Sequence, residues 1–189
     1  MGKVRLSRSF YSRPTLEVAK GLLGKDIVRN YKGREIRGKI IETEAYLGPQ
    51  DRASHAFKGK LTERNKAAYM KGGHVYIYLV YGMHWQFNIS TFKKGVPECV
   101  LIRAISSKED IKKTNGPGKL CKYLKLDKSL YGEDLAKSKE VWLERGENPS
   151  QILYSGRIGI DYAGPYWAKR KLRFLIKDYQ RVLPKVAFS

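Results

Sequence analysis

Short runs of β-branched and aromatic residues, separated by glycine, proline and charged positions, are the dominant pattern along this chain. Such runs are typical of β-strands. We expect strands at residues 26–30, 35–46, 75–81, 84–90, 99–105, 141–143, 157–160 and 172–176. Lys32-Gly33 and Gly82-Met83 each lie between two consecutive strands, which predicts two hairpins with tight turns.

Helical periodicity is confined to a few segments. Residues 14–23 and 117–126 each carry apolar residues on one face, and a threonine that can act as a cap opens residues 62–70. We interpret the polar stretch 128–138 as a surface excursion. Because strands and helices do not alternate regularly, the sequence predicts an α+β fold with a mainly antiparallel sheet. A chain of 189 residues favours one domain, residues 1–189.

One predicted strand carries two carboxylates. Residues 40–46 have the sequence Ile-Ile-Glu-Thr-Glu-Ala-Tyr, which is otherwise that of a buried strand. Alternation places Glu42, Glu44 and Tyr46 on one face, while the opposite, mostly apolar face packs. A carboxylate in this position can act as a general base toward water. Pairing with Lys or Arg on a neighbouring strand is the alternative, and the pattern alone leaves both open.

Charge makes these carboxylates more conspicuous. The chain has 38 Lys+Arg against 18 Asp+Glu, a formal net charge of +20 and 13 tyrosines. An excess of cations accompanied by aromatic rings favours a nucleic-acid partner. The two cysteines and three histidines show no zinc-ligand spacing, so we expect no metal and no cofactor. No run approaches the length of a membrane span, so we expect no membrane partner.

Other polar and aromatic residues stand out within the predicted strands. Tyr76 and Tyr78 share a strand face, a pattern found more often in cores than in pockets. Tyr81 lies at a hairpin tip, where packing explains a large ring poorly and where it could wedge between stacked bases. Arg103 interrupts an apolar strand, and a buried pair with Glu42 is the simplest expectation.

An ordered set of segments resembles the alkyladenine (3-methyladenine) DNA glycosylase family. It covers nearly the whole chain, and its order makes it specific. The segments are residues 42–49 (Glu-Thr-Glu-Ala-Tyr-Leu-Gly-Pro) with His55, then 75–78, 81–83, 88–90, 100–104, 116–121, 141–144, 157–160 and 172–174. Glu63 stands where the family pattern leads us to expect proline, and residues 84–87 are unusual, so lesion preference stays open.

The resemblance implies a fold and a set of roles. The fold would be a curved antiparallel sheet with surrounding helices and a protruding, DNA-intercalating hairpin. Glu44 would be the general base that activates water, and Tyr81 would fill the gap in the duplex. Arg103 and Tyr76 would contact the DNA backbone or hold Glu44 in position. The pocket for the flipped base would be formed by Tyr46, His55, Tyr78 and Asn88.

The function implied is a monofunctional base-excision-repair glycosylase that flips out alkylated purines and hydrolyses the N-glycosidic bond, leaving an abasic site. Its partner would be double-stranded DNA with a damaged purine, and the protein would be a monomer. It would act in the bacterial cytoplasm at the nucleoid, or in a eukaryotic nucleus. Two alternatives stay open: a non-catalytic nucleic-acid-binding module, and a metal nuclease with Glu42 and Glu44 as ligands. In the glycosylase, Glu42 would be a structural partner of Arg103 or another cation.

Overall fold

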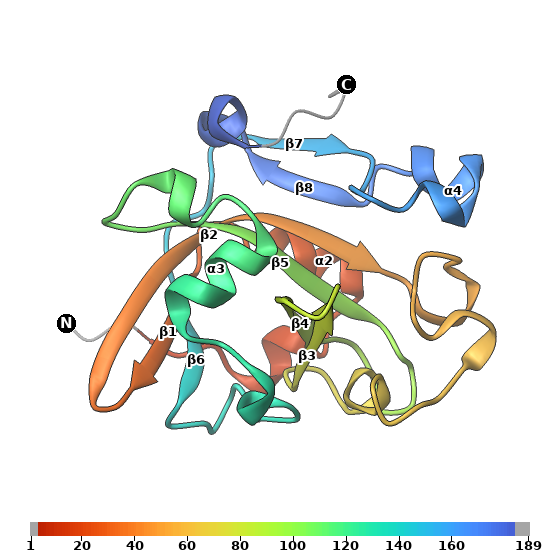
Figure 1. Ribbon diagram of the computed structural model, residues 1–189, viewed down its shortest axis with the longest axis horizontal. Coiled ribbons are helices and arrows are strands. Elements are labelled where there is room, and N and C mark those ends of the chain that lie inside the picture. The colour runs from red at the N-terminus through yellow and green to blue at the C-terminus, as the bar shows by residue number, and fades with distance from the viewer. Residues whose placement is uncertain (1–3, 184–189) are drawn as a thin grey trace.

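The computed structural model describes residues 4–183 (Figure 1). Within them, its helices and strands are α1 (Arg8–Tyr11), α2 (Thr15–Gly21), β1 (Asp26–Tyr31), β2 (Arg34–Tyr46), β3 (Val75–Val80), β4 (His84–Ser90), β5 (Cys99–Ser106), α3 (Pro117–Leu124), β6 (Val141–Glu144), β7 (Ile152–Ser155), α4 (Pro165–Lys169) and β8 (Arg173–Ile176). In this part of the chain the strands form one antiparallel sheet in the order β3-β4-β5-β2-β1-β6, with β8 pairing both β2 and β7. The expected α+β class and mainly antiparallel sheet are confirmed.

The long strand β2 is the centre of the sheet. On one edge its first half pairs with β1, and its residues Glu42–Glu44 pair with β8. On the other edge it pairs with β5, with shifts in register on both sides of Glu42. Such irregularities bend and twist a sheet. The carboxylate-bearing part of β2 therefore has a neighbouring strand on each side, at the point where the sheet curls.

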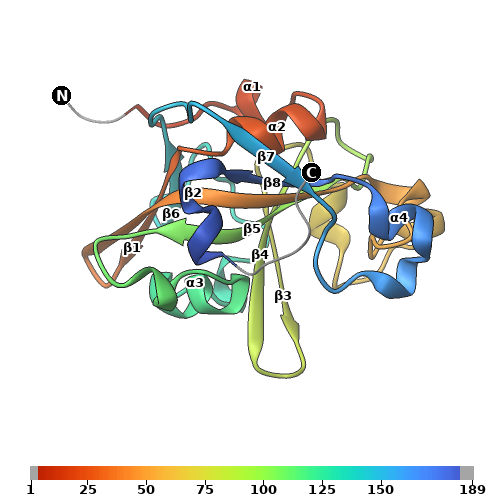
Figure 2. The same cartoon turned by 90° about the horizontal axis from the view of Figure 1, so that it is seen from above.

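The two faces of the sheet carry different elements. Figure 2 shows α1 and α2 on one side and α3 on the other, with the β3–β4 hairpin protruding on the α3 side. The main core is built from the apolar residues of the sheet, α2 and α3, including Leu22, Ile41, Phe87 and Leu120. The hairpin extends beyond this core, so its tip is available for contacts outside the molecule.

The helix expected at residues 62–70 is wrong. The segment forms turns and one short 3-10 turn, organised around the buried side chain of Asn65. The Asn65 amide oxygen accepts the backbone N–H of Thr62 at 2.7 Å, and its amide nitrogen donates to the carbonyls of His55 and Lys60. An asparagine that satisfies several backbone groups competes with a helix for them.

The strand expected at residues 157–160 is also wrong. The strand that pairs with β8 lies a few residues earlier, at β7, and residues 157–160 form a bend with Gly159 at a φ of +73°. The side chain of Arg157 turns inward and the N–H of Ile158 donates to Glu44. Ion pairing and a side-chain acceptor thus replace a strand ladder in this segment.

The interpretation of residues 128–138 as a surface excursion is wrong in part. Leu130 and Leu135 are buried, and the backbone of this stretch pairs with the start of β3. The N–H of Leu135 donates to the Gly73 carbonyl at 2.9 Å. The stretch therefore anchors the base of the hairpin. The helices expected at 14–23 and 117–126 and the remaining strands are confirmed, with ends shifted by a few residues. No helix among the described residues is long and apolar enough to cross a membrane.

Candidate active site

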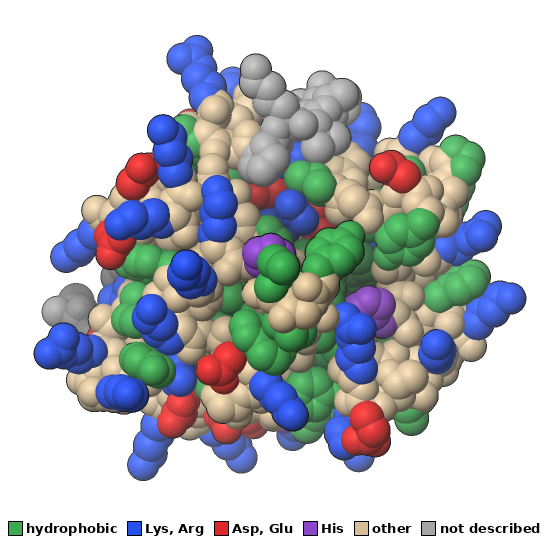
Figure 3. All heavy atoms as spheres, in the orientation of Figure 1, with side chains coloured by type: hydrophobic (Ala, Val, Ile, Leu, Met, Phe, Trp, Pro, Cys, Tyr) green, Lys and Arg blue, Asp and Glu red, His purple; other side chains and the backbone are tan. Residues whose placement is uncertain are grey.

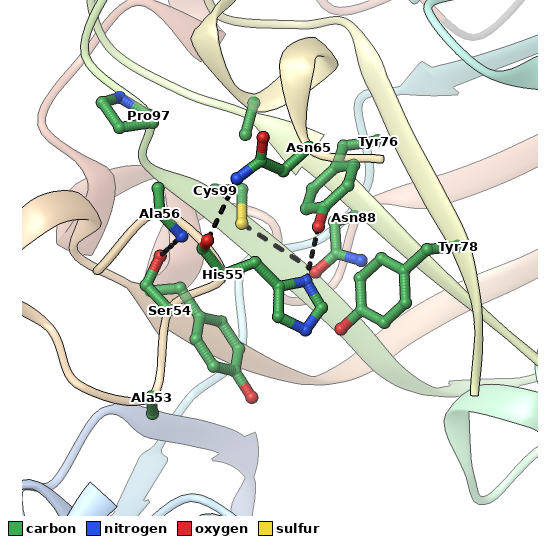
Figure 4. Close-up of a pocket in the computed structure, with 12 residues that line it drawn as sticks. Ala53, Ser54, His55, Ala56, Asn65, Tyr76, Tyr78, Asn88, Pro97 and Cys99 are labelled. Carbon is green, nitrogen blue, oxygen red and sulfur yellow. Dashed lines mark hydrogen bonds between the residues drawn. The ribbon is translucent and has the colours of Figure 1, made fainter. Parts of the chain in front are cut away.

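A pocket opens beside the C-terminal end of β2, at the base of the hairpin (Figure 4). Its walls come from the loop after β2 and from β3, β4 and the start of β5. The space between its walls, together with the solvent at its mouth, is about 330 Å³. The residues that line it are Tyr46, Ala53, Ser54, His55, Ala56, Asn65, Ala68, Tyr76, Tyr78, Asn88, Pro97 and Cys99. All residues expected to form a base pocket are therefore together, with Tyr76 among them.

One wall of the pocket is a cluster of three rings, two of them neighbours on one face of β3. His55 Nδ1 and the Tyr76 hydroxyl oxygen are 2.6 Å apart, and the rings of His55 and Tyr78 lie edge to face at 4.7 Å. The Arg64 guanidinium covers the Tyr78 ring at 4.9 Å. Figure 4 shows the His55 and Tyr78 rings facing the same space. Tyr76 is buried, and its hydroxyl contacts the His55 ring.

The protonation of these rings follows from their surroundings. Burial raises the pKa of Tyr76 and of Tyr78, so both phenols are neutral at pH 7. His55 keeps an exposed edge, but burial of its inner side and the charge of Arg64 lower its pKa. The histidine is therefore neutral at pH 7 as well. The pocket wall is aromatic and uncharged, which suits a flat ring that carries positive charge.

Asn88 lies at the back of the pocket on β4 and is buried. Its amide nitrogen donates to the Gln86 carbonyl at 3.1 Å, and the Cys99 sulfur approaches its amide oxygen at 4.0 Å. Burial raises the pKa of the Cys99 thiol to about 12, so the sulfur keeps its proton. These contacts hold the Asn88 amide in one orientation against anything that fills the pocket.

Tyr46 links the pocket to Glu44. Its hydroxyl donates to Glu44 Oε2 at 3.0 Å, and the Arg157 guanidinium lies over its ring at 4.6 Å. Burial and the adjacent Glu44 charge raise the pKa of Tyr46, so the phenol remains a hydrogen-bond donor. The ring is half-buried and forms part of both the pocket and the larger cleft outside it.

Glu44 is buried completely and is held from several sides. Its Oε1 accepts the N–H of Ile158 at 2.9 Å and lies 3.5 Å from Arg103 Nη1. Arg103, Ile158 and Tyr46 all line the outer cleft, and the bond from Tyr46 reaches Oε2. Both carboxylate oxygens therefore lie next to residues that line the cleft.

Glu42 is paired, as expected, and with two cations. Its Oε1 accepts Arg103 Nε at 3.2 Å and also the Nε of Arg173, whose Nη1 donates to Ser155 Oγ at 3.1 Å. Burial opposes the charge of Arg103, but Glu44 and Glu42 outweigh burial and raise its pKa. Two carboxylates and two guanidiniums thus alternate in a buried row, Arg173–Glu42–Arg103–Glu44, in which formal charges cancel.

The structure contains a second buried ion pair, between Asp51 and Arg157, that the sequence did not predict. Arg157 binds Asp51 through two bonds, Nη1 to Oδ2 at 2.6 Å and Nη2 to Oδ1 at 2.9 Å, and also donates to the Ala45 carbonyl. Both side chains are fully buried. This pair fixes the bend that presents the Ile158 N–H to Glu44. The two residues are 106 positions apart, so their spacing in the sequence does not predict that they pair.

The hairpin tip lies outside the pocket. Tyr81 is 88% exposed, and both it and Gly82 have positive φ, as in the tight turns that join twisted strands. Met83 beside it is 69% exposed. Tyr81 also borders the outer cleft, which continues from the pocket past Arg103. Two large exposed apolar side chains at a protruding tip have no packing role within the molecule.

The outer cleft joins the pocket to the basic surface. Its walls come from the hairpin, the first turn of α3 and residues 158–162, and its empty volume is about 1270 Å³. Figure 3 shows this face of the molecule, with many lysine and arginine side chains and few acidic ones. Among residues 4–183, no group of three or more His, Cys, Asp or Glu side chains could hold a metal ion.

Comparisons with known proteins point to one family. Its model, described as methylpurine-DNA glycosylase, matches residues 9–180. A protein of Natranaerobius thermophilus is 41% identical over 93% of this chain and 96% of its own length. The DNA-3-methyladenine glycosylase of Homo sapiens is 38% identical over 92% of this chain and 66% of its own length, and that of Mus musculus is 38% identical over 92% and 59%.

Proposed function

Because this chain belongs to the methylpurine-DNA glycosylase family, we propose that it is a base-excision-repair DNA glycosylase acting on alkylated purines. The observation that carries this proposal is the position of Glu44, a buried carboxylate bonded to Tyr46, which lines both the aromatic pocket and the outer cleft. A module that only binds nucleic acid does not need a buried carboxylate bonded to a residue of its pocket, whereas a glycosylase needs a general base there.

The damaged nucleotide leaves the duplex and enters the pocket. Extrusion costs a few kcal/mol, and less for a damaged pair. Tyr81 and the hairpin tip fill the vacancy in the stack, which their exposure and protrusion support. The base then lies against the rings of Tyr46, His55 and Tyr78, with Asn88 behind it. An N-alkylated purine is cationic, and neutral rings attract it through their π-faces.

Glu44 acts on the sugar and on water. Cleavage of an N-glycosidic bond builds positive charge on the sugar ring, as in other glycoside hydrolysis. Glu44 stabilises this charge and accepts the proton of the attacking water at Oε1. Because Glu44 has no exposed surface, water has to be admitted beside Oε1 as the nucleotide binds. The contact from Arg103 at 3.5 Å is longer than the one from Ile158, so we place this opening there.

The buried ion pairs hold Glu44, the proposed general base, in place. Glu42 holds Arg103 by its Nε and leaves its Nη1 directed toward Glu44. The Asp51–Arg157 pair fixes the backbone donor on the other side. A cationic purine is already a good leaving group and needs no protonation. No lysine lines the pocket in the described structure, which supports a monofunctional enzyme without lyase activity.

We also propose that residues 1–189 form one domain, which acts as a monomer on double-stranded DNA. The site is built within one chain, since its residues all come from elements of the same sheet and the adjoining loops. The expected compartment is the one that holds the genome, the bacterial cytoplasm or a eukaryotic nucleus.

Base release from defined duplexes tests the proposal. The purified protein is incubated with duplexes carrying 3-methyladenine, 7-methylguanine, ethenoadenine or hypoxanthine, and free base and strand cleavage are measured with EDTA present. We expect release of alkylated purines without strand cleavage. Binding without release would favour the non-catalytic module, and release abolished by EDTA would favour metal chemistry. Efficient strand cleavage at the abasic site would contradict the monofunctional mechanism.

A further inference from the structure

A second basic groove runs along α3, separate from the base pocket. It lies between α3, the 3-10 turn Ile111–Lys113 and the β1–β2 hairpin, and has an empty volume of about 1150 Å³. The residues that line it are Ile36, Glu109, Lys112, Lys113, Lys119, Lys122, Tyr123 and Lys125. Five of these are lysines and one is acidic, so the groove has a strong positive charge.

Most of this charge is unbalanced. Glu109 pairs with Lys113 at 2.9 Å, and the Lys119 ammonium donates to the neutral amide oxygen of Asn115 at 2.9 Å. Within residues 4–183, Lys112, Lys122 and Lys125 make no ion pair. Attraction to the negative end of the helix dipole explains cations in the last turn of α3, but not Lys112, which lies on a different element. An anionic partner accounts for all of them.

The groove is continuous with the cleft of the active site. Lys119 lines both, and residues 116–119 form the wall of the cleft from the same helix. Lys119 and Lys125 are six residues apart, which is about 9 Å along a helix axis. Phosphates of one DNA strand are spaced by about 3.4 Å along the duplex axis, so this length matches two to three successive phosphates.

We propose that this α3 groove binds the phosphate backbone of the duplex that flanks the lesion on one side. The proposal rests on the proposed function, because it takes the DNA to occupy the cleft at Tyr81 and Arg103. DNA that leaves the cleft past Lys119 passes directly over Lys122 and Lys125. The groove lengthens the contact with DNA beyond the flipped nucleotide, and it reads no bases because lysines bind phosphates without regard to sequence.

The salt dependence of binding tests this proposal. The probe is a duplex with a tetrahydrofuran abasic-site analogue at its centre, and two shorter duplexes lack the flank on one side or the other. The variant is Lys122→Gln/Lys125→Gln. The control is Lys93→Gln/Lys94→Gln, which removes the same charge from an exposed loop beside α1, on the face away from the hairpin.

Each phosphate contact contributes about 0.9 to the slope of log K against log salt concentration. We expect the α3 variant to lower the slope by about 0.9 to 1.8 on the full duplex and on only one of the shortened duplexes. The control variant should leave the slope unchanged on the full duplex and on both shortened duplexes. Equal slopes for the two variants, or an equal loss on both shortened duplexes, would overturn the proposal. Base release at saturating enzyme should be the same for the α3 variant and the wild type. If the wild type releases no base, the proposed function is refuted, but the binding measurements still test the α3 groove.

Discussion

Arg103 contacts both carboxylates of β2, with its Nε 3.2 Å from Glu42 Oε1 and its Nη1 3.5 Å from Glu44 Oε1. One guanidinium therefore connects a glutamate that is locked in the core to the glutamate that we propose as the base. The two carboxylates are two residues apart on one strand face, yet their surroundings differ. Glu42 faces a second arginine, whereas Glu44 faces a tyrosine hydroxyl, a backbone N–H and the lining of the cleft.

Glu42→Gln should destabilise the protein. The change leaves Arg103 and Arg173 buried with one carboxylate fewer, and breaking a buried ion pair by removing one partner costs about 3–5 kcal/mol. The free energy of unfolding in urea measures this effect. Glu109→Gln is the matched control, because Glu109 and its partner Lys113 are both at least 50% exposed, and such pairs contribute about 1 kcal/mol or less. Equal effects of the two changes would contradict the row of ion pairs.

Tyr46→Phe should slow base release without removing the ring that stacks on the base. It deletes the hydroxyl that donates to Glu44 Oε2 at 3.0 Å. A hydrogen bond to a charged group is worth about 1.5–3 kcal/mol, so we expect a loss of about tenfold or more in single-turnover rate. Tyr76→Phe is the control, since its hydroxyl contacts His55 rather than Glu44. A single-turnover rate for Tyr46→Phe equal to that of the wild type would show that the Tyr46 hydroxyl does not assist Glu44.

His55 should make the handling of cationic lesions depend on pH. Its pKa is lowered from 6.5, so the unfolded chain takes up the proton first as the pH falls. The contribution of neutral His55 to stability is complete above about 6.5 and declines as the pH falls from there toward the lower pKa of the folded state. Protonated His55 would also repel a cationic purine.

Binding measured from neutral to acidic pH checks this expectation. Affinity for a duplex with 7-methylguanine should fall once the pH drops below the pKa of His55 in the folded protein, which is lower than the ordinary value of about 6.5. Affinity for a neutral hypoxanthine duplex should fall less. In His55→Gln the difference between the two lesions should not change with pH. If the difference in affinity between the two lesions changes with pH as much in His55→Gln as in the wild type, another group causes the effect.

Tyr81→Ala should weaken lesion binding and leave the chemistry intact. The exposed ring is the candidate wedge, and unstacking a base step costs a few kcal/mol that the wedge offsets. We expect the Kd for an abasic-site duplex to rise about tenfold or more, with a smaller change in the maximal single-turnover rate. Met83→Ala serves as a control for loss of apolar surface at the same tip. If both variants bind like wild type, the tip is not the wedge.

Much of this architecture is contained in local sequence patterns. Glycines between strands predict both hairpins, and alternation around residues 40–46 predicts that Glu42, Glu44 and Tyr46 share a face. The pairing of Glu42 with Arg103 also followed from the sequence, because an arginine inside an apolar strand needs a carboxylate. Each of these conclusions depends on residues that are close in sequence or on one clear electrostatic requirement.

What the sequence could not supply are contacts made across the fold. The Asp51–Arg157 pair and the Ile158 donor come together only because β8 docks on β2 and carries the bend before it to Glu44. Residues 62–70 have a capping threonine, yet the buried Asn65 side chain binds the backbone of Thr62, Lys60 and His55. In both segments, hydrogen bonds between side chains and backbone groups outweighed the local preference.

The central claim is that Glu44 is the general base, and Glu44→Gln tests it most directly. Glutamine keeps the size of the side chain. Its single amide oxygen can accept from Ile158 while its amide nitrogen donates to the Tyr46 hydroxyl oxygen, but it cannot take a proton from water. Single-turnover release of 3-methyladenine from a duplex and binding to an abasic-site duplex should be measured together. We expect release to fall by about 100-fold or more while binding is retained. Undiminished base release by Glu44→Gln would contradict the mechanism.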